Sequence, residues 1–210
     1  MSREEWLSIA RNADANDLRE AILTGFKAGK PFTPYIPTLD LPSGLNWVLD
    51  FGCGVGRNFP YLQSIASHVV GFDLEPMIQR CRDLADTSVD QLTYDWKALT
   101  ERRFDLIVAS LVLQHIETAA CTSFLAAFAH LAPLTYVLTR SRSDFERNVL
   151  DIITQADCFD VLTCVKVDHD AATHQLRNLG PVPFATAAQG LNDDHYELLL
   201  RSRSFTRSDR

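Results

Sequence analysis

The chain has 210 residues, 46% of them hydrophobic, which suits one globular domain with a sizeable core. No apolar run approaches the length of a membrane span and no signal peptide precedes the polar start, so we expect a cytoplasmic protein without membrane contact. The five cysteines lack metal-ligand spacing, and we expect them to be reduced thiols. The net charge of −7 argues against nucleic acid as a partner, and we interpret the serine- and arginine-rich stretch 201–207 as a solvated end of the chain.

The first part of the chain is predicted to hold helices and an extended linker. Residues 2–24 have helical apolar spacing, and Ser2 with Glu5 forms a capping box. A second helix fits residues 16–26. Glycines and prolines then predict an extended linker up to residue 37.

The most informative stretch is 48–58, an apolar strand that runs into a glycine-rich turn. Gly52, Gly54 and Gly56 alternate through this corner, which allows positive φ and close approach of the backbone to a ligand. The following helix would present its unpaired amides to that ligand. The next buried strand ends on Asp73, and an acid at this place in a doubly wound sheet reaches the paired hydroxyls of a ribose.

The remaining segments alternate between strand and helix patterns, without repeats or a second domain. The predicted strands after residue 58 are 69–73, 91–94, 104–110, 135–139, 161–167 and 196–201. The predicted helices of this part are 59–66, 117–132 and 144–156.

Residues 45–140 resemble the class I S-adenosylmethionine-dependent methyltransferases in four segments that occur in the same order and spacing. The family's acidic-x-Gly-x-Gly-x-Gly motif is matched by Asp50, Gly52, Gly54 and Gly56, its ribose carboxylate by Asp73, and its fourth-strand segment by 104–116. A nicotinamide-binding fingerprint would instead need its third glycine at position 57, where Arg57 stands.

The resemblance implies a fold and a donor. The expected fold is α/β, with a doubly wound, seven-stranded and mostly parallel sheet, an antiparallel seventh strand, and helices on both faces as a three-layer sandwich. The expected cofactor is S-adenosyl-L-methionine, and the product is S-adenosyl-L-homocysteine. We expect residues 45–210 to form the methyltransferase domain and residues 1–44 to cap its pocket. The long connection 168–195 is interpreted as a substrate-side lid, with a surface excursion as the alternative.

The resemblance also implies which residues hold the cofactor. Leu74 and Met77 are candidates for packing on adenine, Asp95 for accepting its amino N–H, and Trp96 for covering the ring. Met77 could equally be plain core, and Asp95 could be a loop acid beside a packed tryptophan. The full implied set is Asp50, Gly52, Cys53, Gly54, Gly56, Asp73, Leu74, Met77, Asp95, Trp96, Ser110 and Leu111.

The acceptor side is less defined. His115 is the candidate general base because histidine titrates near neutrality, although the family also places histidine here for packing and hydrogen bonding. The stretch from Ser110 to Leu113 lacks the Asn/Asp-Pro-Pro-Tyr of amide and adenine methyltransferases and offers no metal-binding carboxylate, so no metal is predicted. Candidate substrate-binding residues are Tyr35, Arg140, Arg142 and His169, with Phe32 as a further pocket wall and Asp170, His174 and His195 on the same rim.

We therefore expect transfer of a methyl group from S-adenosylmethionine to an oxygen or nitrogen of a small molecule that could be anionic. Three alternatives stay open: a methyltransferase acting on tRNA or protein, a donor-binding protein without transfer activity, and a nicotinamide oxidoreductase. The chain is expected to be a monomer or a homodimer.

Overall fold

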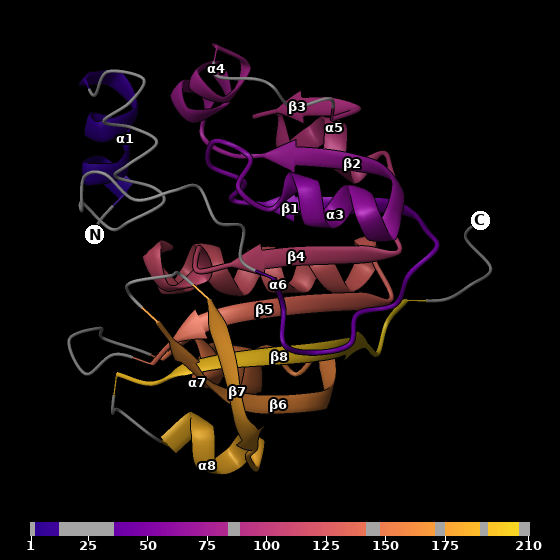
Figure 1. Cartoon of the computed structure of the whole chain (residues 1–210), viewed down its shortest axis with the longest axis vertical. Coiled ribbons are helices and arrows are strands. Elements are labelled where there is room, and N and C mark those ends of the chain that lie inside the picture. The colour runs from indigo at the N-terminus through magenta and orange to yellow at the C-terminus, as the bar shows by residue number, and fades with distance from the viewer. Residues whose placement is uncertain are drawn as a thin grey trace.

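One open sheet forms the centre of the computed structural model, which describes residues 3–12, 36–83, 89–141, 148–170, 175–189 and 193–205. Within these residues, eight strands lie in the order β3-β2-β1-β4-β5-β8-β6-β7 (Figure 1). The strands are β1 Leu45–Phe51, β2 Ala66–Phe72, β3 Gln91–Thr93, β4 Leu106–Ser110, β5 Leu134–Arg140, β6 Phe159–His169, β7 Leu176–Pro181 and β8 His195–Ser202. The helices are α1 Arg3–Asn12, α3 Phe59–Ile65, α4 Glu75–Asp83, α5 Trp96–Thr100, η1 Leu113–His115, α6 Thr118–Leu131, α7 Val149–Ala156 and α8 Phe184–Gln189.

The sheet is parallel from β3 to β5 and antiparallel beyond β5. β8 lies between β5 and β6 and pairs antiparallel with both, so β6 runs parallel to β5. The strand order changes direction between β1 and β4, which is the topological switch point where open α/β sheets bind ligands. The predicted doubly wound, mostly parallel sheet with an antiparallel last strand is confirmed.

The predicted count of seven strands is wrong, because β7 lies inside the connection 168–195. β7 pairs with the end of β6, with His169 opposite Leu176 and Val165 opposite Pro181. Its sequence, LRNLGP, holds no β-branched or aromatic residue, so no strand pattern marks it. Part of the predicted lid therefore extends the sheet.

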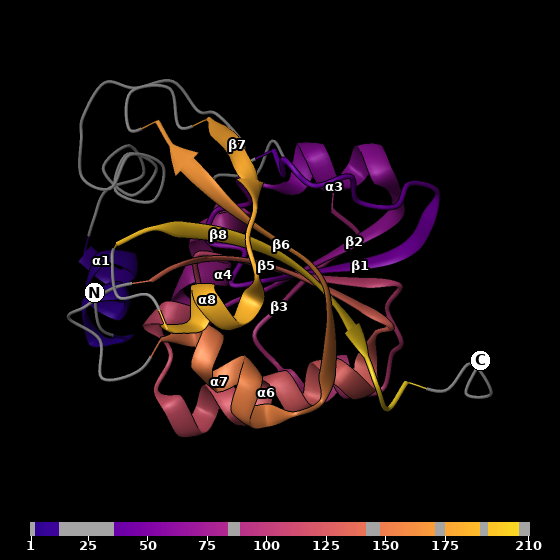
Figure 2. The same cartoon turned by 90° about the horizontal axis from the view of Figure 1, so that it is seen from below.

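Helices cover both faces of the sheet, as Figure 2 shows: α6, α7 and α8 lie on one side and α3 on the other. The two faces bury separate cores. Leu49 and Phe51 of β1 join the cluster that contains Leu125 of α6, whereas Val48 joins the cluster that contains Phe59 of α3. No helix in the part of the chain that the structure describes is long and apolar enough to cross a membrane.

Several predicted segments are described only in part. α1 confirms the beginning of the helix predicted for residues 2–24. Residues 13–35, with the second predicted helix, lie outside the described residues, as does the beginning of the helix predicted for 144–156. Three short helices, α5, η1 and α8, were not predicted, because five, three and six residues are too few to establish a helical period.

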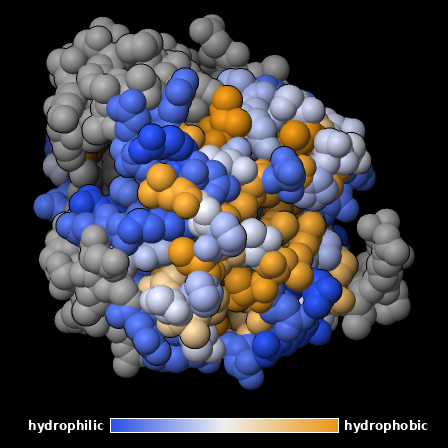
Figure 3. Space-filling model, turned by 60° about the horizontal axis from the view of Figure 1, so that its bottom comes forward, coloured by the Kyte–Doolittle hydropathy of each residue, from blue (hydrophilic) through white to orange (hydrophobic). Residues whose placement is uncertain are grey.

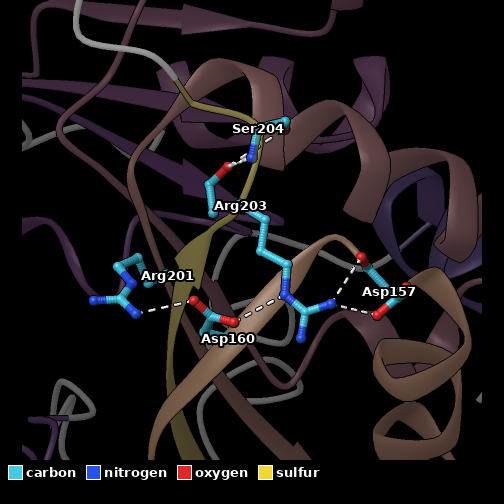
Figure 4. A network of polar contacts seen from close by, with 6 residues as sticks. Asp157, Asp160, Arg201, Arg203 and Ser204 are labelled. Carbon is cyan, nitrogen blue, oxygen red and sulfur yellow. Dashed lines mark hydrogen bonds and ion pairs between the residues drawn. The ribbon is translucent and has the colours of Figure 1, made fainter.

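The arginines at the end of β8 have partners. In Figure 4, Arg201 and Arg203 both form ion pairs with Asp160, with N–O distances of 2.9 and 2.8 Å, and Arg203 also pairs with Asp157. These exposed ion pairs contribute little to stability. The prediction of a solvated end is wrong for Arg201 and Ser202, because β8 continues to Ser202. Thr206 and Arg207 lie outside the described residues.

Apolar side chains are exposed where β6 and β7 form the end of the sheet. Leu162 of β6 is 44% exposed and Leu179 of β7 is 50% exposed. Figure 3 brings this end of the molecule forward and shows apolar surface gathered between polar patches. Among the described strands, β7 pairs only with residues 165–169 of β6, so the first half of β6 is an open sheet edge.

A buried carboxylate ties the linker before β1 to the sheet. Glu197 of β8 is fully buried and accepts hydrogen bonds from the main-chain N–H of Thr38 at 2.8 Å, from the Thr38 hydroxyl, and from the Tyr136 hydroxyl at 2.6 Å. Leu39 and Leu41 pack against the core on the α3 side. The linker is thereby fixed across the face of β5 and β8.

We expect Glu197→Gln to lower the free energy of unfolding by about 1–3 kcal/mol, because the amide keeps one acceptor oxygen and turns its –NH₂ toward a donor. Urea denaturation followed by circular dichroism measures this loss. Glu101→Gln, at an exposed position beside α5, is the matched control and should change stability by less than about 0.5 kcal/mol. Equal stability of the two variants would show that Glu197 does not hold the linker.

Candidate functional site

The turn after β1 has the backbone that its glycines predict. Gly52, Gly54 and Gly56 have φ values of +76°, +57° and +85°. A Cβ atom at Gly52 would lie 2.3 Å from Val112 Cγ2, and one at Gly56 would lie 2.5 Å from the Phe59 ring. Positions 52 and 56 therefore need glycine both for φ and for room.

Asp73, directly after β2, holds this turn in place. Its Oδ2 accepts a hydrogen bond from Gly54 N at 2.7 Å, and its Oδ1 accepts one from Leu74 N at 2.6 Å. Phe72 O accepts from the N–H groups of Gly52 and Cys53 at 2.8 and 3.1 Å. Burial raises the pKa of Asp73 to about 6, although both main-chain N–H groups favour the charged form.

Asp50, near the end of β1, is a fully buried carboxylate. Its Oδ1 has a long contact of 3.5 Å with Asn58 Nδ2, and within the described residues its Oδ2 has no hydrogen-bond partner. The pKa of Asp50 is raised to about 7, chiefly by burial and also by the nearby Asp73, against the opposite effect of the Asn58 hydrogen bond. A buried carboxylate oxygen without a partner calls for a cation or a donor.

The residues predicted to surround an adenine have contacts within the protein. Met77 is 3% exposed and packs in a cluster with Ala10 of α1 and Val55 of the turn, against which Leu74 also packs. Met77 is therefore as buried as the alternative interpretation, a core side chain, predicts. The same cluster brings α1 against α4 and the glycine turn.

Asp95 and Trp96 also have structural contacts. Asp95 is exposed and caps α5 by accepting a hydrogen bond from Lys97 N at 2.9 Å. The Trp96 ring is half-buried and lies edge-on to Phe72 and Phe124, with centroids 5.5 and 4.9 Å apart. Trp96 thus belongs to the aromatic core beside the end of β2.

The segment after β4 brings main chain to the same edge of the sheet. Ser110 ends β4, and Leu111 has a φ of +54° while its N–H donates to Leu138 O at 2.7 Å. A positive φ is uncommon for leucine and stores strain, as often occurs at ligand-binding sites. Ser110 and Leu111 therefore lie at the carboxyl edge together with Asp50.

His115 is held by a residue that the sequence did not indicate. Gln114 Oε1 accepts a hydrogen bond from Arg140 N at 2.7 Å, and Gln114 Nε2 lies 3.3 Å from His115 Nε2. Because the Gln114 amide has its oxygen toward Arg140, it presents N–H to His115, whose Nε2 then accepts. This contact supports the structural role that the sequence left open for His115.

Two of the predicted substrate-binding residues lie at the carboxyl edge, beyond β4. Arg140 ends β5 and pairs with Asp193, with 3.3 Å between Nη2 and Oδ2. His169 ends β6, and its ring centroid is 5.4 Å from that of His195. Tyr35 and Arg142, and also Phe32 and His174 on the predicted rim, lie outside the described residues. Across the described ranges, no three His, Cys, Asp or Glu residues gather as metal ligands.

The strand order, the glycine turn and the carboxylates at the ends of β1 and β2 agree with the fold that the resemblance to the class I S-adenosylmethionine-dependent methyltransferases implies. Residues 48–133 match the family described as "Methyltransferase domain". This match covers less than half of the chain. It supports the resemblance to the class I S-adenosylmethionine-dependent methyltransferases, whose methyl donor is S-adenosylmethionine. No curated protein matches the chain in sequence.

Solved structures share the fold at low sequence identity. The N-methyltransferase NodS from Bradyrhizobium japonicum, in complex with S-adenosyl-L-homocysteine, is 15% identical with a TM-score of 0.52, over 76% of this chain and 79% of NodS. A TehB-like methyltransferase from Corynebacterium glutamicum is 17% identical with a TM-score of 0.53, over 95% of both chains. The [4+2]-cyclase SpnF is 16% identical with a TM-score of 0.54, over 77% of this chain and 76% of SpnF.

Proposed function

We propose that this chain transfers a methyl group from S-adenosylmethionine to an oxygen or nitrogen of a small molecule, with the donor held at the carboxyl ends of β1, β2 and β4. The observation that carries this proposal is the unpartnered, buried Oδ2 of Asp50 beside the glycine turn. The ammonium of the donor's methionine part would supply the missing partner.

Other residues at this edge fit the same ligand. The Asp73 carboxylate is tied to Gly54 and Leu74 through one lone pair of each oxygen, which leaves acceptor capacity for two ribose hydroxyls. Gly52, Cys53 and Gly56 would keep the main chain close to the ligand. On the adenine side, Leu74, Met77, Asp95 and Trp96 complete the proposed set, with Ser110 and Leu111 beside the methionine part.

The donor supplies a methyl carbon activated by cationic sulfur, so the protein mainly has to position the acceptor and exclude water. Elements that cover the site would help to position the acceptor and to exclude water. Ala10 of α1 packs with Val55 of the turn, which supports a cap formed by residues 1–44. The described part of 168–195 begins and ends at the carboxyl edge, where an acceptor-side cover would lie.

The proposal is tested by binding and by turnover. Calorimetry should detect S-adenosylhomocysteine binding, and a metabolite library should contain an acceptor that converts the donor to S-adenosylhomocysteine. Turnover only with tRNA or protein would refute the small-molecule acceptor and keep the donor. Binding without turnover on any acceptor would identify a donor-binding protein, and the cyclase SpnF is one fold neighbour whose name indicates other chemistry.

We expect the affinity for S-adenosylhomocysteine to rise with pH. The pKa values of Asp50 and Asp73 are raised to about 7 and about 6, so both carboxyl groups gain protons as pH falls through these values. An ammonium and two hydroxyls favour the ionised forms, so binding releases protons. Affinity should increase by up to about tenfold per pH unit between about 6 and about 7, and more steeply below about 6, where both groups carry protons. Calorimetry in two buffers of different ionisation enthalpy measures the protons released.

The control for this pH dependence is Asp50→Asn, which keeps the shape of the side chain and cannot ionise. Its affinity should be lower above about pH 7 and should retain only the part of the pH dependence that comes from Asp73. Affinity of the unaltered protein that falls with rising pH would mean that Asp50 binds as a neutral acid and does not meet the ammonium.

A further inference from the structure

Three basic side chains form a row across the end of the sheet. Arg140 ends β5, His195 begins β8 and His169 ends β6. The register pairs Arg140 with His195 and His195 with Val167. Directly paired residues share a face of the sheet, and so do residues two apart along a strand. The three side chains therefore lie on the same face, at the carboxyl edge.

This face is the one that carries the proposed donor site. Val48, Val108 and Val167 all belong to the core on the α3 side. Asp50 follows Val48 by two residues, and Ser110 follows Val108 by two, so both have the orientation that His169 takes after Val167. The row thus continues the donor site from β1 and β4 across β5, β8 and β6.

The sheet separates two acids of this region, Asp168 and Asp194, from the row. Strand alternation places Lys166 and Asp194, which pair at 2.7 Å, on the opposite face. Asp168 and Arg177, which pair at 2.8 Å, lie on that face too. On the face of the row, Asp193 is bonded to Arg140 through a half-exposed contact at 3.3 Å. Glu197, two residues after His195, also lies on this face, where it is fully buried and bonded to Thr38 and Tyr136.

Arg140 also has unused donor capacity. Its Nε is buried and has no hydrogen-bond partner within the described residues, while its Nη2 holds only the exposed Asp193. An oxyanion carries two oxygens at the spacing of a guanidinium fork and could bond Nε and an Nη group together. The structure therefore offers a bidentate position that Asp193 does not fill.

His195 adds a second, switchable charge. Its pKa is lowered to about 4, first by burial and then by His169 and Arg140, against the opposite influence of Asp194 and Asp168. His195 is therefore neutral near pH 7. An anion placed between Arg140 and the two imidazoles would favour the protonated form of His195 and raise its pKa.

We propose that Arg140, His195 and His169 form a subsite for a carboxylate or phosphate group of the methyl acceptor, and that His195 takes up a proton from solvent when the anion binds. This inference rests on the proposed function, because it assigns the row to the acceptor of that site. It names the substrate class: a small molecule in which an oxyanion anchors one end and the nucleophilic atom extends toward β4.

Sulfate is the probe, because its charge stays constant between about pH 5 and about pH 8, where histidine titrates. Titration of protein saturated with S-adenosylhomocysteine should shift the ring signals of His195 and His169 in NMR spectra of histidine-labelled protein, assigned among six histidines with His195→Gln. Sulfate should raise the pKa of His195. The affinity for sulfate should grow by about tenfold for each unit by which pH falls below the pKa of His195 in the sulfate complex.

Arg140→Gln should weaken sulfate binding by about tenfold or more, and His195→Gln should abolish its pH dependence. Arg177→Gln, which removes an arginine from the opposite face of the same edge, should leave sulfate binding unchanged. Sulfate that leaves the His195 pKa in place, or that binds Arg140→Gln as tightly as the unaltered protein, overturns the subsite. If the unaltered protein does not bind S-adenosylhomocysteine, the donor assignment is refuted. Sulfate titration of the protein without S-adenosylhomocysteine still tests the row in that case.

Discussion

Replacement of Asp73 by alanine is expected to weaken S-adenosylhomocysteine binding by about a hundredfold. Two hydrogen bonds from ribose hydroxyls to a charged carboxylate contribute about 3 kcal/mol together, and each 1.36 kcal/mol corresponds to about tenfold in affinity. The substitution also frees the N–H groups of Gly54 and Leu74, which Asp73 holds at 2.7 and 2.6 Å. The turn should then become less ordered. Calorimetric titration with S-adenosylhomocysteine measures the loss.

Asp90→Ala is the matched control. Asp90 likewise accepts a main-chain hydrogen bond, from Val69 N at 2.8 Å, but it precedes β3 and so lies at the amino edge of the sheet. Its removal should lower stability by about 1 kcal/mol and leave S-adenosylhomocysteine affinity unchanged. Asp73→Asn separates charge from shape, and we expect it to lie between the alanine variant and the unaltered protein. An affinity of Asp73→Ala equal to that of Asp90→Ala would remove Asp73 from the proposed site.

Local signals in the sequence were sufficient for the donor half of the fold. The glycines of the turn have positive φ values, which residues with a Cβ atom rarely adopt, and this conformational preference is local. Asp73 could be located because it directly follows an apolar strand, and strand order follows from the alternation of strands and helices. The carboxyl edge of β1, β2 and β4 could therefore be predicted before any contact was known.

The acceptor half depends on long-range contacts, which no local pattern records. Gln114 binds Arg140 across 26 positions, and Asp193 meets Arg140 only because β8 returns antiparallel to β5. β7 has no strand composition and forms because the end of β6 offers free backbone groups. His195 was only one of several polar residues on the rim, and its neutral state arises from burial and from neighbours on two other strands.

Substitution of Gly52 by alanine is expected to lower the free energy of unfolding by about 2–5 kcal/mol and to abolish S-adenosylhomocysteine binding. A φ of +76° costs a non-glycine residue about 1–2 kcal/mol. The added Cβ would lie 2.3 Å from Val112 Cγ2, and relieving such a contact typically costs about 1–3 kcal/mol more. Relief would move either the turn or the segment after β4, and both belong to the proposed donor site.

Gly44→Ala separates the two causes. Gly44 has a φ of +70°, but no atom lies within 4 Å of its added Cβ, so only the backbone strain of about 1–2 kcal/mol should appear and binding should persist. Because the close atoms at Gly52 all belong to Val112, Val112→Gly should partly restore Gly52→Ala and leave Gly44→Ala unimproved. Chemical denaturation of the three single and two double variants measures this coupling. Equal losses at positions 44 and 52, without rescue, would mean that backbone strain alone makes glycine necessary in the turn and that the packing of β4 against it does not shape the donor site.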